Sequence, residues 1–166
     1  MMRALAFLGF LLFILPLLIL AAGQFGLFVG RSPFDLGVRE GKLKPPSRTQ
    51  NSVSSQAGLW PDGDYASTYA SIEPLRVRGD SATAITRLRA LLSTWPGARI
   101  VAEEPDYLRV EFMTRWLGFV DDAEFWLDPA AKAIQVRSAS RVGSRDYSVN
   151  RRRIEAIRAR WDTAGA

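Results

Sequence analysis

The sequence predicts an α+β protein: an N-terminal transmembrane helix precedes a two-layer domain, in which two helices cover an antiparallel sheet of four or five strands. Three observations lead to this prediction. Residues 4–22 contain no charged or hydrogen-bonding side chain. Between residues 98 and 140, short runs of alternating apolar and polar residues follow one another through tight turns, which is typical of antiparallel strands. Two segments with apolar residues at helical spacing flank these runs, and each needs an apolar sheet face to cover.

The composition excludes several classes of protein. The chain has 166 residues, which fits one domain and a short appendage. It contains no cysteine and no histidine, so it lacks disulfides, thiolate nucleophiles, Cys/His zinc sites and the commonest general base. We therefore expect a non-catalytic protein with no catalytic residues, no cofactor and no metal.

The first predicted element is the apolar run at residues 4–22. As an α-helix this run is roughly 28 Å long, close to the roughly 30 Å hydrocarbon core of a bilayer. Pro16 is tolerated in such a helix. The small residues 21–23 fit a signal-peptide cleavage site, but the run is longer than the roughly 7 to 15 apolar residues usual for a signal peptide. The length favours a retained anchor over a cleaved signal.

The charges beside this run leave two orientations open. Arg3 precedes the run, whereas Arg31, Arg39 and Lys42 follow it, and a literal count favours a cytoplasmic domain. A short basic N-terminus before an apolar run is nevertheless typical of export, and long domains translocate largely regardless of charge. We therefore expect a single-pass protein of the bacterial inner (cytoplasmic) membrane whose domain is periplasmic or otherwise extracytoplasmic.

The remaining chain divides into two parts after an anchor and its flank at residues 1–30. Residues 31–70 are rich in Gly, Pro and Ser and show no sustained hydrophobic period, which predicts an extended segment. Their apolar side chains are too many for a free linker, so part of this segment should pack on the domain. Residues 71–166 form the predicted α+β domain.

The domain begins with a short strand at residues 72–77 and a helix capped by Asp80 or Ser81. Pro96 and Gly97 end this helix. Its apolar face consists of Ala84, Ile85, Leu88, Leu91, Leu92 and Trp95.

Four further strands are predicted at residues 98–102, 106–113, 119–127 and 132–140. Alternation sorts their side chains onto two faces. The inward set is Leu108, Val110, Phe112, Phe119, Asp121, Ala123, Phe125, Leu127, Ile134 and Val136. The outward set is Tyr107, Arg109, Glu111, Val120, Asp122, Glu124, Trp126, Gln135 and Arg137.

A final helix is predicted from Tyr147 to Trp161, with Asp146 or Ser148 as its cap. One face of this helix is apolar and the others are largely arginine. The apolar face consists of Val149 or Asn150, Ile154, Ile157 and Trp161.

Three strings in this domain resemble one family. They are FVDDAEFWLD at residues 119–128, IQVRSASRVGSRDYSVNRRRIEAI at residues 134–157, and the upstream DLGVREGKLKPPSRTQNSVSSQ at residues 35–56. The chain resembles the bacterial and plastid family catalogued as domain of unknown function 1499. This resemblance implies no activity. Many members carry cysteines around a segment ending NCVSS where this chain has Ser52, so no redox, disulfide or metal role of those cysteines carries over.

Asp121, Asp122 and Glu124 form the first candidate site, since three carboxylates so close in sequence can ligate a hard cation. Alternation places Asp121 on the opposite face from the other two, so the three cannot simply converge. We expect Asp122 and Glu124 to form ion pairs with Arg137 or Arg109 across the sheet.

A second candidate site combines arginines, hydroxyls and a helix N-terminus, which favour phosphate or carboxylate. Its residues are Arg137, Ser138, Ser140, Arg141, Asn150 and Arg151. The segment lacks the spacing of a phosphate-binding loop. The alternative is that these arginines pair with the acidic strands, because residues 100–128 carry eight acidic and two basic side chains and residues 137–160 carry eight basic and two acidic ones.

These observations predict a membrane-tethered, non-catalytic domain of the cell envelope that binds a protein, a lipid or a small anionic ligand. Its expected partners are the membrane, through residues 4–22, and a protein or anionic lipid. Nucleic acid is not expected, because a nucleic-acid reader keeps its basic surface unpaired. Two alternatives stay open: a metal- or carboxylate-dependent enzyme using Asp121, Asp122 or Glu124, and a membrane regulator facing the cytoplasm.

Overall fold

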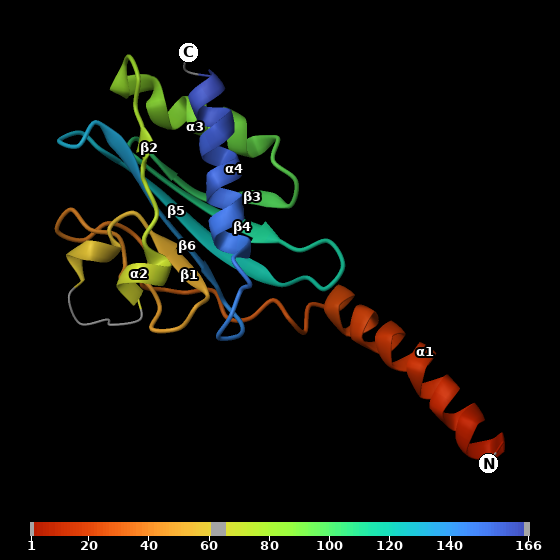
Figure 1. Ribbon diagram of the computed structural model, residues 1–166. Coiled ribbons are helices and arrows are strands. Elements are labelled where there is room, and N and C mark those ends of the chain that lie inside the picture. The colour runs from red at the N-terminus through yellow and green to blue at the C-terminus, as the bar shows by residue number, and fades with distance from the viewer. Residues whose placement is uncertain (1, 61–65, 165–166) are drawn as a thin grey trace.

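A computed structural model describes residues 2–60 and 66–164 of the chain (Figure 1). The secondary structure comprises α-helices, two short 3-10 helices (η) and strands. In chain order they are α1 (Met2–Gln24), β1 (Ser52–Ser54), η1 (Ala57–Leu59), α2 (Ala66–Ala70), β2 (Leu75–Arg76), η2 (Ser81–Thr83), α3 (Ala84–Ser93), β3 (Ala98–Glu104), β4 (Tyr107–Met113), β5 (Val120–Asp128), β6 (Ala133–Ser140) and α4 (Val149–Ala164).

The strands form one antiparallel sheet in the order β1-β6-β5-β4-β3, and β2 also pairs with β6. The α+β class and the antiparallel sheet are therefore confirmed. The strand number is corrected to six, because β1 lies within residues 31–70, where no strand is predicted. Its sequence, Ser-Val-Ser, is too short and too polar to show a hydrophobic period, although all three residues are buried.

The apolar core lies between one face of the sheet and the helices α3 and α4, which both cover that face (Figure 1). The apolar faces predicted for both helices pack into it, and Asp80 caps η2 by accepting a hydrogen bond from the Ala82 amide at 2.9 Å. Core residues include Val53, Leu75, Leu88, Leu92, Leu108, Val110, Phe112, Ala123, Phe125, Ile134, Val136, Ile154, Ile157 and Trp161.

Two predicted boundaries are wrong. Phe119 is not an inward strand residue, because β5 begins at Val120 and the Phe119 ring stacks on Phe28 with ring centroids 5.2 Å apart. The last helix begins at Val149 and not at Tyr147, because Tyr147 and Ser148 adopt positive φ angles of 50° and 64°, outside the helical region.

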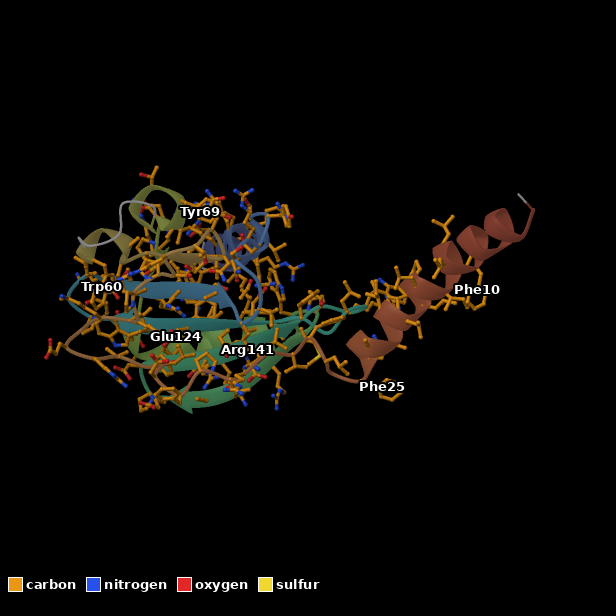
Figure 2. The ribbon with its side chains drawn as sticks, turned by 90° about the horizontal axis from the view of Figure 1, so that it is seen from below. Phe10, Phe25, Trp60, Tyr69, Glu124 and Arg141 are labelled. Atoms are coloured by element: carbon orange, nitrogen blue, oxygen red, sulfur yellow. The ribbon has the colours of Figure 1, made fainter. Side chains whose placement is uncertain are left out.

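The second face of the sheet also differs from the prediction. Its polar side chains are expected to point outward, but most of them are buried: Glu111, Asp122, Glu124, Gln135 and Arg137. Residues 31–47, which we call the N-terminal strap, lie over this face and past Glu124 and Arg141 (Figure 2). The strap shields these groups from water and contributes polar groups of its own.

Helix α1 projects away from the domain, and its C-terminal end is joined to the β4–β5 loop (Figure 1). Gln24 Nε2 donates a hydrogen bond to the Trp116 carbonyl at 2.8 Å. A Cβ atom at Gly23 would lie 2.7 Å from the Leu117 carbonyl oxygen, so only glycine allows this approach. Over the part of the chain that the structure describes, no helix combines the length and apolar character that a membrane span needs. The span expected at residues 4–22 stays a prediction.

Candidate functional site

The sheet face opposite α3 and α4 carries an ordered network of charged side chains. We call it the charged face and define it by six residues: Arg109, Glu111, Asp122, Glu124, Arg137 and Arg141. They occupy alternate positions of β4, β5 and β6 and the residue directly after β6, so the pleat directs them to the same side.

Asp122 is the centre of this network and is only 1% exposed. Arg141 Nε donates to Asp122 Oδ2 at 2.7 Å, and Arg109 Nη2 donates to Asp122 Oδ1 at 2.9 Å. Arg141 Nη2 also reaches Glu111 Oε1 at 2.5 Å, and Arg99 contacts the other oxygen of Glu111 at 2.5 Å. Three arginines therefore hold two carboxylates in a continuous chain of ion pairs.

The electrostatics of this chain favour the ionised forms. Burial alone would raise the pKa of the Asp122 carboxyl, but hydrogen bonds from Arg141 and Arg109 outweigh it and hold that pKa below its ordinary value. The same balance, with Arg141 and Arg99 as donors, lowers the pKa of Glu111. The hydrogen bond to Asp122 in turn raises the pKa of Arg141. These shifts favour the ionised forms of Asp122, Glu111 and Arg141.

Glu124 is fully buried and is satisfied by three donors. The Gly37 amide donates to Oε1 at 2.7 Å, Tyr107 Oη donates to the same oxygen at 3.0 Å, and Arg137 Nη1 lies 3.4 Å from Oε2. Burial raises the pKa of Tyr107, and the nearby negative charge of Glu124 raises it further. The Glu124–Arg137 pair is the longest of the ion pairs on this face.

The three carboxylates of the first candidate site do not converge. Asp121 lies on the helix-covered side and pairs with Arg153 at 2.7 Å, whereas Asp122 and Glu124 lie on the charged face. The pairs Asp122–Arg109 and Glu124–Arg137 are those that the sequence pattern favours. Among the residues described, no group of three or more acidic side chains is arranged to hold a metal ion.

The second candidate site is split between the two faces of the sheet. Arg137 and Arg141 lie on the charged face, whereas Ser138 and Ser140 hydrogen-bond to Asn150 of α4 on the other face. Arg151 donates to the carbonyls of Tyr69 and Ser71, on the far side of α4. The six residues therefore form no single anion site, because successive residues of β6 point to opposite faces.

Asn150 instead supports the fold through its hydrogen bonds. It is fully buried, and its side-chain Nδ2 donates to the Asn51 carbonyl at 3.2 Å and to Asp146 Oδ2 at 2.9 Å. Asp146 caps α4, as predicted, by accepting a hydrogen bond from the backbone amide of Asn150 at 2.9 Å. It also accepts one from Tyr69 Oη at 2.7 Å. Burial would raise the pKa of Asp146, but the Tyr69 and Asn150 hydrogen bonds lower it.

A groove of about 620 Å³ opens between the strap and the charged face. Its lining includes four cationic side chains, Arg31, Lys44, Arg137 and Arg141, and two acidic ones, Asp35 and Asp122. Lys44 pairs with Asp35 at 2.7 Å. Within the described residues, Arg31 has no hydrogen-bond or ion-pair partner through its side chain. Three of the four cationic side chains in the groove are thus paired with carboxylates, whereas the Arg31 guanidinium is free to bind.

Sequence reasoning missed the strap side of this site. Ser32 Oγ accepts a hydrogen bond from Arg109 at 2.7 Å, the Pro45 carbonyl accepts one from Arg137 at 3.2 Å, and Ser47 donates its amide to Ser52 Oγ at 2.8 Å. These are mostly contacts of an irregular backbone, which leaves no period in a sequence. The only available signal is the number of apolar residues in the segment.

A comparison with protein families identifies this domain. The family described as "Protein of unknown function (DUF1499)" matches residues 42–160, and the chain belongs to this family. The resemblance seen in the sequence is therefore confirmed. No curated protein and no solved structure matches the chain. The matched span runs from the middle of the strap to α4 and contains the whole charged face, whereas α1 and Arg31 precede it.

Proposed function

We propose that this member of the family is a membrane-tethered, non-catalytic domain of the bacterial cell envelope that binds a small anionic ligand in the groove under its N-terminal strap. The observation that carries the proposal is the exposed Arg31 guanidinium, which has no ion-pair partner among the described residues and lines the same groove as Arg137. The tether and the binding site are separate parts of the proposal, and each has its own test.

The exposed surface of α1 supports the tether. Its large apolar side chains stand free of the domain: Phe10, Leu11, Leu12, Phe13, Leu15, Leu17, Leu18 and Ile19. Such a continuous apolar surface needs a cover, and the run at residues 4–22 has the length of a bilayer core. The joint between α1 and the β4–β5 loop would then hold the domain directly at the membrane surface.

We propose that the domain lies outside the cytoplasm, because the short basic N-terminus before the apolar run is typical of exported proteins. The opposite orientation would make the protein a cytoplasm-facing regulator. A reporter enzyme that is active only outside the cytoplasm, fused to the C-terminus, separates the two. Activity of this fusion supports an extracytoplasmic domain, and its absence together with activity of a cytoplasmic reporter contradicts it.

Arg31 and Arg137 are the residues expected to hold the anion. Arg31 is free and exposed, and Arg137 is buried at the wall of the groove with the longest of the ion pairs. Burial lowers the pKa of Arg137, so an added negative charge would stabilise its cationic form. Guanidinium groups bind phosphate and carboxylate through two parallel hydrogen bonds, which makes an oxyanion the best chemical match.

Pairing of the carboxylates supports a non-catalytic domain over an enzyme. A general acid or base needs a carboxyl group that can exchange a proton near neutral pH. Glu111 and Asp122 are held by arginines, and Glu124 accepts from a backbone amide, a hydroxyl and an arginine. An enzyme using Asp121, Asp122 or Glu124 is therefore the weaker proposal.

The tether is tested by placing charge in α1. The double variant Leu12→Arg/Leu15→Arg should lose retention in membranes, since each arginine near the centre of a span costs roughly 2.5 to 3.5 kcal/mol. Leu59→Arg is the control, because Leu59 is also an exposed leucine but lies in η1 of the domain. Retention of the double variant after a high-salt wash would contradict the tether.

The groove is tested with inorganic phosphate and pyrophosphate as probes, by calorimetric titration of the full chain in detergent micelles. Arg31→Gln should weaken binding by roughly tenfold, as expected for loss of about 1.4 kcal/mol. Arg39→Gln, which removes an exposed strap arginine outside the groove lining, should leave it unchanged. Equal binding by both variants and the parent would contradict the site.

A further inference from the structure

A second cavity, distinct from the groove, lies at the end of the domain where α1 is attached. It measures about 380 Å³, within the range of small-molecule pockets, and lies between the β4–β5 loop and the segment that joins β6 to α4. Its apolar lining includes Phe119, Val120, Val142, Tyr147 and Val149. We call it the apical pocket.

The chain that follows α1 runs along this pocket. Phe28 stacks on the pocket residue Phe119 with ring centroids 5.2 Å apart. A Cβ atom at Gly30 would lie 2.8 Å from the side chain of Val142, another pocket residue. The apical pocket is therefore beside the helix end, and the joint of α1 fixes its position relative to that helix.

Exposed aromatic and apolar side chains lie in the two segments that border the pocket and in the turn that follows α1. Trp116 is 64% exposed and Tyr147 is 81% exposed, and Phe25, Leu27 and Val142 are also exposed. Figure 2 shows Phe25 at the C-terminal end of α1, projecting away from the helix. So many exposed apolar groups at one end of a domain mark an interaction surface.

Two exposed arginines and a strained backbone segment also lie at this end of the domain. Arg115 and Arg145 are exposed on the two loops, and Arg145 also lines the pocket. Tyr147 and its neighbour Ser148 both have positive φ angles, a conformation that costs free energy for residues other than glycine. The strained backbone places an exposed aromatic ring at the rim of an apolar cavity.

We propose that the apical pocket takes an acyl chain of a bilayer phospholipid, while Arg115 and Arg145 contact the lipid phosphate. The inference rests on the proposed tether, which would bring this end of the domain to the bilayer. Tryptophan, tyrosine and arginine at the rim match the side chains that gather at membrane interfaces. The two carboxylates in the lining already accept hydrogen bonds, Asp121 from Arg153 and Asp146 from Tyr69. The remaining, largely apolar lining therefore matches a hydrocarbon chain better than a peptide or a polar metabolite.

The test uses the full chain in liposomes that contain a phospholipid with a photoactivatable diazirine on one acyl chain. After irradiation, the labelled peptides are identified by mass spectrometry. We expect label both in α1 and in residues 113–120 or 141–149. Label in α1 alone would overturn the pocket while leaving the tether intact. Absence of label from α1 would overturn the tether, and label confined to the two loops would show a lipid-binding pocket without an anchor. Absence of label from both regions would overturn both proposals.

A variant makes the test specific for the pocket. Val142→Asp puts a charge at the rim on an exposed loop, where the fold should tolerate it, and should lower pocket labelling relative to α1 labelling about tenfold. Leu59→Asp is the matched control on η1 and should leave the ratio unchanged. A thermal melt confirms that both variants are folded. An unchanged ratio in a folded Val142→Asp variant would overturn the proposal.

Discussion

The two faces of the sheet are built from the same strands, and both carry buried residues. Apolar packing stabilises one face, whereas ion pairs and hydrogen bonds stabilise the other. On one face, Phe125 and its neighbours pack against α3 and α4 with no polar partner required. On the other, Asp122 and Glu124 are as deeply buried as the apolar residues, but each accepts hydrogen bonds from several donors. Alternation along a strand therefore shows which face a residue points to, but not whether the residue is buried.

The two faces also differ in the segments of the chain that cover them. A helix with an apolar stripe covers the apolar face, and its period is visible in the sequence. The charged face is covered by the irregular strap, whose amides and carbonyls complete the hydrogen bonds of the side chains beneath it. A buried charge is tolerated only when its partners are supplied in this way.

The largest effect is expected on the apolar face. Phe125→Ala removes the largest fully buried side chain of the core and should lower the free energy of unfolding by about 3 to 5 kcal/mol. Denaturant titration of the full chain in detergent micelles measures it. A loss below about 1 kcal/mol, the size typical of an average substitution, would break the comparison by showing that this face is loosely packed.

A slightly smaller effect is expected at the centre of the charged face. Asp122→Asn leaves Arg109 without its buried counter-charge and leaves Arg141 with Glu111 alone, and it should cost about 3 kcal/mol. The double variant with Arg141→Gln should lose less than the sum of the two single losses, because the two residues form one network.

The matched control is an exposed ion pair of similar geometry. Arg89 and Glu103 lie 2.7 Å apart with about half of each side chain exposed. Glu103→Gln should change stability by at most about 0.5 kcal/mol. Equal losses from Asp122→Asn and Glu103→Gln would show that the charged face is open to water in solution.

Acid should weaken the charged face and spare the apolar face. The pKa values of Asp122 and Glu111 are lowered in the fold, so their contribution to stability is fully present above their ordinary values and is lost as the pH falls through the depressed ones. We expect stability to decline below about pH 4. Asp122→Asn should make that decline shallower, and an identical pH profile for parent and variant would contradict the assignment.

A smaller loss than at Asp122 is expected at Gln135, at the edge of the charged face. Gln135 Oε1 accepts from Ser55 Oγ at 2.7 Å, and Nε2 donates to Asp128 Oδ2 at 3.2 Å. Gln135→Ala should cost about 1 kcal/mol, because Ser55 and Asp128 keep other hydrogen bonds. Thermal melts measure it, and a loss as large as that of Phe125→Ala would mean that Gln135 supports more of the face than these bonds indicate.

The sequence reveals the apolar half of this protein better than the charged half. The strands around Phe112, Ala123 and Val136 follow the period of two, so their inward positions can be assigned from the chain alone. The burial of Glu124 cannot be assigned in that way, because it depends on the Gly37 amide, 87 residues away in a segment without a period. Strand alternation places the side chains of Arg137 and Ser138 on opposite faces of the sheet. A search for residue types that cluster in the sequence does not reveal this separation.

Amide hydrogen exchange of the full chain tests most directly whether the strap closes the charged face. Gly37 donates its amide to Glu124 at 2.7 Å, and Leu43 donates its amide to Gln56 at 2.8 Å. We therefore predict that peptides covering residues 36–44 exchange slowly, at rates close to those of β5, because their opening requires disruption of the domain. The exposed segment at residues 78–80, which lies outside the helices and strands, serves as the fast-exchanging reference. Exchange of residues 36–44 as fast as this reference would contradict the account, since the charged face would then lie open to solvent.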